Sequence, residues 1–111
     1  MSDILAELNK VLLERKECAD PDSSYVASLH AAGMDKILEK VGEEAAEVII
    51  AAKNAAQNPQ HSDACVAEIA DLWFHSMVLL SELERSSEDV LAVLAERFGV
   101  SGHTEKASRS R

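Results

Sequence analysis

The sequence predicts an all-α fold, a bundle of four to five helices that is completed by dimerisation. Its 111 residues contain one Trp, one Tyr, two Phe, four Gly and two Pro. Such a composition, rich in Ala, Leu and Glu, favours helix over a β-sandwich or barrel. Apolar residues also recur at helical spacing along most of the chain. A single domain of this length, residues 1–111, builds only a modest core, so we expect a homodimer.

The first two helices are expected at residues 3–17 and 24–32. In the first, Leu5, Leu8 and Leu12 recur at helical spacing. The Asp-Pro-Asp-Ser run at 20–23 ends this helix and offers a cap for the next one. Gly33 is a natural stop for the second helix. Three side chains of the second helix are expected to point inward: Tyr25, Val26 and Leu29.

A long helix is expected at residues 34–56, followed by another at about 62–84. The dipeptide Asn58-Pro59 ends the long helix, because proline disfavours helical backbone in the residue before it. Ser62 or Asp63 is expected to cap the helix that follows, since both side chains accept hydrogen bonds from free backbone N–H groups. These two helices carry most of the candidate metal-binding, catalytic and substrate-binding residues.

The last helix is expected to end near Phe98. Ser86-x-x-Asp89 resembles a capping box at its start, and Gly99 stands where a C-cap glycine is expected. Residues 100–111 are polar, so we interpret them as a mobile tail.

Charge and cysteine usage exclude several classes of function. The net charge of −9 argues against nucleic-acid binding by bulk electrostatics. Cys18 and Cys65 have no C-x-x-C spacing, so we read both as reduced thiols and expect no zinc site. We find no secretion signal and no apolar run near the roughly 20 residues of a membrane span. We therefore expect a cytoplasmic protein that binds no membrane.

Two pairs of acids stand inside otherwise apolar stretches: Glu44 with Glu47, and Glu68 with Asp71. Residues three apart share a helix face, so antiparallel packing of the two helices would bring four carboxylates together. Repulsion and desolvation would make such a group costly without a cation. All-oxygen ligands suit Mg²⁺, with Mn²⁺ as the alternative. The other interpretation, left open here, is that these acids lie on solvated helix faces.

Several polar residues are expected on the same faces. Lys36, Lys40 and Asn54 fall in one quadrant of the long helix with its two acids, and His75 aligns with Glu68 and Asp71. Lys40 is either an i,i+4 partner of Glu44 or a phosphate ligand. His75 is either a hydrogen-bonded core residue or a ligand. Gly42 in mid-helix costs about 1 kcal/mol relative to Ala, which suggests a close backbone approach or a tolerated defect.

The Glu-Glu-x-x-Glu motif at 43–47 and Glu-x-x-Asp at 68–71 resemble the all-α nucleotide pyrophosphohydrolases, which include MazG-like and dimeric dUTPase-type enzymes. Within this superfamily the sequence is most similar to the phosphoribosyl-ATP pyrophosphohydrolase family. The residues that carry this narrower resemblance are Ser24-Tyr25 and the segments 33–44, 51–54, 68–72 and 105–109. The resemblance implies a MazG-like helical bundle.

The resemblance also implies an activity. It is the hydrolysis of the α–β phosphoanhydride of 1-(5-phosphoribosyl)-ATP to 1-(5-phosphoribosyl)-AMP and pyrophosphate, the second step of histidine biosynthesis. Four acids would hold Mg²⁺: Glu44, Glu47, Glu68 and Asp71. Glu43 would orient or deprotonate the attacking water. The residues expected to bind substrate are Lys36, Lys40, Lys53, Asn54, His75, Lys106 and Arg109. Lys53 lies opposite Glu44 on its helix, so it would act across a subunit interface or support structure only.

Two other functions remain open at the level of sequence. One is a housecleaning pyrophosphatase that acts on dUTP, dCTP or damaged nucleotides with the same metal site. The other is a non-catalytic helical interaction protein, whose acids are solvated or bind Ca²⁺ weakly. Release of pyrophosphate in the presence of Mg²⁺ would exclude the interaction protein. Turnover of a panel of nucleotides would then distinguish the housecleaning enzyme from the phosphoribosyl-ATP pyrophosphohydrolase.

Overall fold

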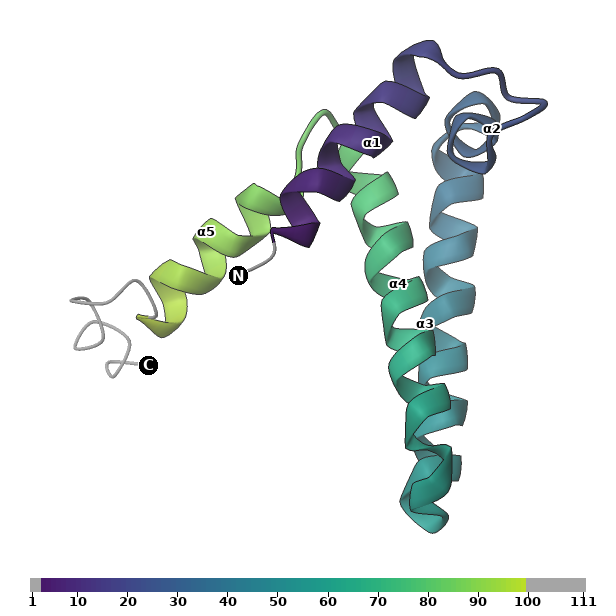
Figure 1. Cartoon of the computed structure of the whole chain (residues 1–111), viewed down its shortest axis with the longest axis vertical. Helices are drawn as coiled ribbons and strands as arrows, with labels where there is room; N and C mark the ends of the chain where they lie inside the picture. Colours follow the sequence, from purple (N-terminus) through teal and green to yellow (C-terminus); the bar gives the residue numbers. More distant parts are fainter. Residues whose placement is uncertain (1–2, 100–111) are drawn as a thin grey trace.

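The computed structural model describes residues 3–99, and within that range every regular element is a helix (Figure 1). The elements are α1 (Ile4–Cys18), α2 (Tyr25–Ala32), α3 (Met34–Gln57), the short 3-10 helix η1 (Pro59–His61), α4 (Ser62–Glu82) and α5 (Ser87–Phe98). The expected all-α fold is confirmed, and each predicted helix boundary lies within two residues of the observed one. The expected mobile tail, residues 100–111, lies outside the described residues.

The helices α3 and α4 form a long antiparallel hairpin (Figure 1). At its tip the Asn58 side chain accepts a hydrogen bond from the Gln60 N–H at 3.2 Å and so caps η1. The prediction that Ser62 or Asp63 caps α4 is wrong. The 3-10 turn runs directly into α4, and the Ser62 N–H already donates to the Pro59 carbonyl, so no side chain is needed there.

Two local signals place α2 across one end of this hairpin. The Ser24 hydroxyl accepts a hydrogen bond from the Ala27 N–H at 3.1 Å, which makes Tyr25 the first helical residue. Gly33 then separates α2 from α3 with a φ of 103°. This backbone conformation is rarely adopted by residues with a side chain, so glycine permits the sharp turn between the two helices.

The hydrophobic core lies where α1, α2, the start of α3 and the second half of α4 meet. Its buried residues are Leu12, Val26, Leu29, Ile37, Met77 and Val78. Val26 and Leu29 point inward as predicted, but Tyr25 does not, because 49% of its surface remains exposed. Tyr25 lies at the edge of this core, where its hydroxyl finds a polar partner on α4.

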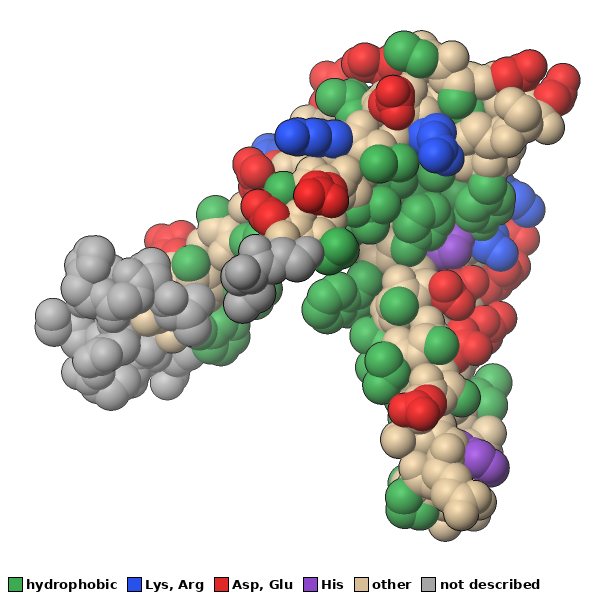
Figure 2. All heavy atoms as spheres, viewed as in Figure 1, with side chains coloured by type: hydrophobic (Ala, Val, Ile, Leu, Met, Phe, Trp, Pro, Cys, Tyr) green, Lys and Arg blue, Asp and Glu red, His purple; other side chains and the backbone are tan. Residues whose placement is uncertain are grey.

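The helix α5 begins with the predicted capping box, in which Ser86 and Asp89 exchange side-chain and backbone hydrogen bonds. From there α5 projects away from the α3–α4 hairpin and packs mainly on α1 (Figure 1). The Cα radius of gyration is 16.5 Å, against about 13 Å for a compact domain of this length. Figure 2 shows apolar side chains on the surface between α5 and the hairpin. The described chain is thus open, with much apolar surface uncovered.

One helical stretch, Pro59–Glu82, is long and apolar enough to cross a membrane by length and composition alone. The expectation that no apolar run approaches this length is therefore wrong. The finding is weak evidence for a membrane, since core helices of soluble proteins pass the same test. This stretch also carries Glu68 and Asp71 near its middle and packs along α3. Both acids would be expensive in a bilayer.

Candidate active site

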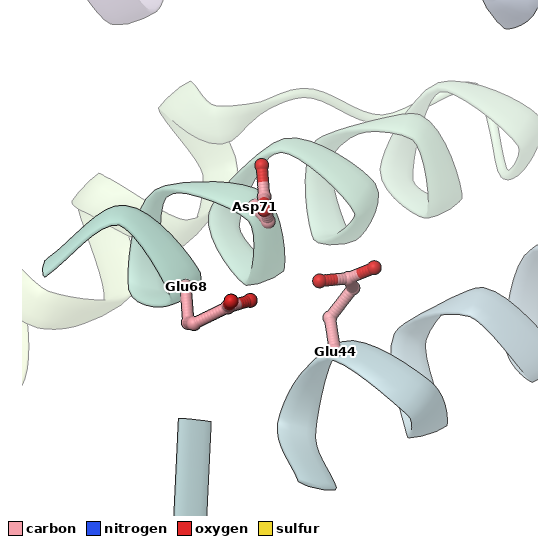
Figure 3. Close-up of side chains that lie close together, drawn as sticks. All are labelled: Glu44, Glu68 and Asp71. Carbon is pink, nitrogen blue, oxygen red and sulfur yellow. The ribbon is translucent and has the colours of Figure 1, made fainter. Parts of the chain in front are cut away.

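Three carboxylates from two helices converge on the α3–α4 hairpin. Glu44 projects from α3 toward α4, which carries Glu68 and Asp71 one turn apart (Figure 3). One oxygen from each of the three lies within 4.8 Å of the other two. In Figure 2 acidic side chains gather along this edge of the hairpin, next to a histidine and to basic side chains. The predicted convergence of acids from the two helices is present for these three residues.

The three acids differ in burial: Glu44 is buried, Glu68 is partly buried and Asp71 is exposed. Glu44 is 7% exposed, and one oxygen each of Glu44 and Glu68 is buried without a hydrogen-bond partner. Burial raises the pKa of Glu44 above its usual 4.5, and repulsion from Glu47 and Asp71 adds to the shift. Burial also raises the pKa of Glu68, together with a hydrogen bond and repulsion from Glu47. Without a cation, ionisation of these neighbouring carboxyl groups is electrostatically unfavourable.

The donor set fits a hard divalent cation. Carboxylate oxygens are the ligands that Mg²⁺, Mn²⁺ and Ca²⁺ prefer, and the cluster contains no thiolate or imidazole ligand that would favour zinc. The two unpaired buried oxygens of Glu44 and Glu68 are the atoms that a cation would satisfy. The other interpretation, acids on solvated helix faces, does not account for the burial of Glu44.

Glu47 lies next to the three-residue cluster rather than in it. It interacts with Glu44 and Glu68, and with Glu68 it lines a groove of about 320 Å³ that continues along the hairpin toward η1. Asn54 lines the same groove, as the shared helix face predicted. The remaining lining residues are Ile50, Ala51, His61 and Ala64. Sequence reasoning missed His61, because an exposed histidine in a helix connection carries no signal by itself.

Glu43 and Lys40 pair with each other on the exposed side of α3. The Lys40 Nζ lies 3.1 Å from the Glu43 Oε1, and this contact lowers the pKa of Glu43 and raises that of Lys40. The i,i+4 partner considered for Lys40, Glu44, is therefore not the one that it contacts most closely. A carboxyl with a lowered pKa is a weaker base than the role considered for Glu43 requires.

The other basic residues that were expected to bind the substrate do not form a cluster. Lys36 lies one turn before Lys40 on α3 and contacts Glu39 at 3.5 Å. Lys53 is exposed near the far end of α3. Lys106 and Arg109 lie outside the described residues. Of the cations on the described chain, Lys40 therefore has the closest link to the acids, through its pairing with Glu43 and its influence on the pKa of Glu44.

Gly42 does not mark a close backbone approach. A Cβ atom added at this position would meet nothing within 4 Å in the described part of the chain. The interpretation of Gly42 as a packing requirement is wrong for the isolated chain, because this side of α3 faces open space.

His75 is a buried, hydrogen-bonded residue. Its Nδ1 lies 2.8 Å from the Asp71 carbonyl oxygen, and its Nε2 lies 2.8 Å from the Tyr25 hydroxyl. With both nitrogens engaged, His75 has no free donor or acceptor for a ligand in this arrangement. Tyr25 was expected to point inward from the second helix and is one of the residues that carry the family resemblance. Its contact with His75 spans fifty residues, and no local pattern indicates it.

Comparison with known proteins identifies the family. The model of the family described as phosphoribosyl-ATP pyrophosphohydrolase matches residues 5–98. A phosphoribosyl-ATP pyrophosphatase from Hydrogenovibrio crunogenus (strain DSM 25203 / XCL-2) is 54% identical over 110 residues. This alignment covers 99% of the present chain and 96% of the relative. With three converging acids at the motif positions and a match over nearly its whole length, the chain belongs to the phosphoribosyl-ATP pyrophosphohydrolase family.

Proposed function

We propose that this protein is a Mg²⁺-dependent hydrolase that cleaves the α–β phosphoanhydride of 1-(5-phosphoribosyl)-ATP. The products are 1-(5-phosphoribosyl)-AMP and pyrophosphate, in the second step of histidine biosynthesis. The observation that carries the proposal is the cluster of Glu44, Glu68 and Asp71, with its unpaired buried oxygens, in a chain that matches this family from residue 5 to residue 98.

In this proposal Glu44, Glu68 and Asp71 hold the metal, and Glu47 completes the set from beside the cluster. When bound, Mg²⁺ neutralises charge that develops on the phosphate oxygens and makes a bound water more acidic. Glu44 is itself shielded from water, which strengthens its own electrostatic contact with a cation, whereas Asp71 is exposed. The three acids come from two rigid helices, so their positions are set before substrate arrives.

Lys40 and Glu43 have linked roles in this proposal. Phosphate oxygens compete with Glu43 for the Lys40 ammonium, which is partly exposed and close to the acids. When Lys40 turns to the phosphates, Glu43 loses the contact that lowers its pKa and becomes a stronger base for the attacking water. Lys36, one turn away, adds positive charge for the same anion, and Asn54 in the adjoining groove donates to the substrate.

The protein acts as a homodimer in the cytoplasm in this proposal. An apolar groove of about 280 Å³ lies between α4, α5 and the start of α1. It is lined by Leu5, Trp73, Ser76, Met77, Leu80, Ser87, Val90, Leu91 and Leu94. Trp73 is 58% exposed, and Leu91 on α5 is 46% exposed. Covering these side chains with a second copy would supply the core that one chain lacks. Lys53, on the far side of α3 from Glu44, would then act across the interface or support structure only.

The experiment that tests this function is a pyrophosphate-release assay with Mg²⁺ and phosphoribosyl-ATP, set against a panel of dNTPs and NTPs. We expect turnover of phosphoribosyl-ATP to exceed that of every other nucleotide. Glu44→Gln and Asp71→Asn should each lower kcat/KM by about 100-fold or more, because each removes a charged ligand. Asp63→Asn removes an exposed acid from the first turn of α4 and serves as the matched control.

Preferred turnover of dUTP or dCTP would favour a housecleaning enzyme instead. Failure to release pyrophosphate from any nucleotide would favour a non-catalytic interaction protein. Full activity of Asp71→Asn would refute the proposed metal site while leaving the family membership intact.

A further inference from the structure

A chain of hydrogen bonds runs from α2 into the turn of α4 that carries Asp71. The Tyr25 hydroxyl lies 2.8 Å from Nε2 of His75, and Nδ1 of the same imidazole lies 2.8 Å from the carbonyl oxygen of Asp71. Tyr25 is placed at the first position of α2 by the cap that Ser24 provides. A local signal in the sequence thus sets up a contact with a residue fifty positions further along the chain.

The chemistry of the groups assigns the protons along this chain. A carbonyl oxygen can only accept a hydrogen bond, so Nδ1 of His75 must carry a proton. In the neutral imidazole, Nε2 is then an acceptor and Tyr25 is the donor. The direction is therefore Tyr25 O–H to Nε2, and Nδ1–H to the Asp71 carbonyl. Both nitrogens of the imidazole therefore have a hydrogen-bond partner.

Aromatic contacts hold the same imidazole from its sides. The His75 ring packs edge-on against Phe74, with ring centres 5.0 Å apart, and against Tyr25, with ring centres 5.7 Å apart. Tyr25 and Phe74 in turn stack with ring centres 6.3 Å apart. His75 is 6% exposed. The imidazole therefore has little freedom to rotate, and its two hydrogen bonds join α2 to the turn of α4 that carries Asp71.

The link also lies close to the other helix of the site. The helix α2 packs against α3, and His75 and Tyr25 lie near enough to α3 to interact with Glu44 and Lys40, respectively. Tyr25 therefore stands where the three helices α2, α3 and α4 come together beside the acids.

We infer that Tyr25 and His75 are positioning residues of the carboxylate site: their hydrogen-bonded link holds the Asp71 turn of α4 at a fixed spacing from Glu44 on α3. This inference rests on the proposed function, because the spacing matters for holding the cation. In this role neither residue touches the cation or the substrate. They act through the backbone of Asp71 and through the packing of α2 against the hairpin.

A second link between α2 and α4 provides an internal comparison. Nδ1 of His30 lies 2.6 Å from Oε1 of Glu82, near the C-terminal ends of both helices. This contact joins the same two helices away from the acids. Its imidazole leaves Nε2 buried and unpaired, whereas both nitrogens of His75 are bonded. The side-chain link between α2 and α4 therefore does not depend on Tyr25 alone, and α2 is also held by its packing on α1 and α3.

The test replaces Tyr25 with phenylalanine, which keeps the stacked ring and removes only the hydroxyl. Mn²⁺ binding is measured without nucleotide, by titration with electron paramagnetic resonance. We expect Tyr25→Phe to raise the dissociation constant for Mn²⁺ about 10-fold, the size of effect typical for residues that orient metal ligands. Glu82→Gln, which weakens the other α2–α4 link, should lower the melting temperature but leave Mn²⁺ binding unchanged. Both variants are measured well below their melting temperatures.

Imidazole nitrogen chemical shifts supply a readout that needs no metal. The wild-type protein should show His75 protonated at Nδ1 and unprotonated at Nε2, and in Tyr25→Phe the Nε2 resonance should move toward that of a nitrogen without a hydrogen bond. A wild-type His75 protonated only at Nε2 would overturn the inference, as would equal Mn²⁺ affinity in wild type and Tyr25→Phe. Absence of Mn²⁺ binding in the wild type would instead refute the proposed metal site, and this inference with it.

Discussion

The ammonium of Lys40 lies 3.1 Å from the carboxylate of Glu43, immediately before Glu44 on α3. Neighbouring residues on a helix point about 100° apart, so Glu43 faces solvent while Glu44 turns toward α4. Two adjacent acids in the same motif therefore have opposite electrostatic environments. The contact with Lys40 lowers the pKa of Glu43, whereas burial raises that of Glu44.

Replacing Lys40 with methionine should raise KM for phosphoribosyl-ATP about 10-fold and change kcat less. The reason is that the lost ammonium contributes to binding of the phosphates in both the ground state and the transition state. The melting temperature should hardly change, because the ion pair with Glu43 is exposed. Steady-state kinetics check this, with Lys10→Met on α1 as the control that removes one exposed charge elsewhere. An unchanged KM would rule out a phosphate-binding role.

Replacing Glu43 with glutamine tests its role as the base. If Glu43 deprotonates the water, kcat should fall by about 10²-fold or more while KM is retained. The same change at Glu47 should weaken activity mainly at low Mg²⁺, because Glu47 borders the cluster and its loss weakens metal binding. A full kcat in Glu43→Gln together with a large loss in Glu47→Gln would transfer the role of base to Glu47.

The contribution of Glu44 and Glu68 to the stability of the metal-free protein should fall as pH rises above their unfolded-state pKa. The pKa values of Glu44 and Glu68 are raised above 4.5 in the folded protein, so the folded state holds these protons more tightly than the unfolded chain. Their contribution to stability is present below the unfolded-state pKa and is lost as pH rises through the folded-state pKa. Circular dichroism melting curves with a chelator measure this trend.

Added Mg²⁺ should reverse the loss at neutral pH and have little effect at the acidic end, since protonated carboxyls do not bind it. In the metal-free state at neutral pH, Glu44→Gln should melt at a higher temperature than the wild type, because it removes a buried, unpaired charge. The same variant should gain less from Mg²⁺. A lower melting temperature for metal-free Glu44→Gln would contradict the electrostatic account of the cluster.

Light scattering at micromolar concentration should report at least twice the chain mass of 12.0 kDa. Leu94 lines the apolar groove beside α5 and is 43% exposed, so Leu94→Glu should place a charge in the subunit interface and shift the protein toward monomer. Glu96→Gln on the same helix is the matched control at an exposed polar position. A wild-type protein that is stable and active at 12.0 kDa would refute dimerisation.

Deleting residues 103–111 should weaken turnover of phosphoribosyl-ATP by an amount that shrinks at high salt. Lys106 and Arg109 are lost in this variant, and part of their attraction for phosphates is screened by ions. The melting temperature should remain nearly unchanged. Kinetics at low and high ionic strength check the expectation, and a fall in melting temperature without a kinetic change would assign the segment a role in packing alone.

Much of the fold was predictable because its signals are local. Helix boundaries follow from caps and breakers such as the Ser86–Asp89 box and Pro59, whose effects act within one or two turns. The i,i+3 spacing put Glu68 and Asp71 on one face for the same reason. The cap of α4 was the exception, since the 3-10 turn before it made a side-chain cap unnecessary.

The sequence by itself therefore determined the helices, the faces on which their acids lie, and the family to which the motifs point. Only the tertiary structure decided that Glu44 enters the three-residue cluster while Glu47 stays beside it, and that Tyr25 reaches His75 across fifty positions of the chain. The periodicity of a helix sets a side chain's direction to within a quadrant. Contacts between helices depend on how α2, α3 and α4 pack and rotate against one another, and that packing is a property of the whole core rather than of any short segment.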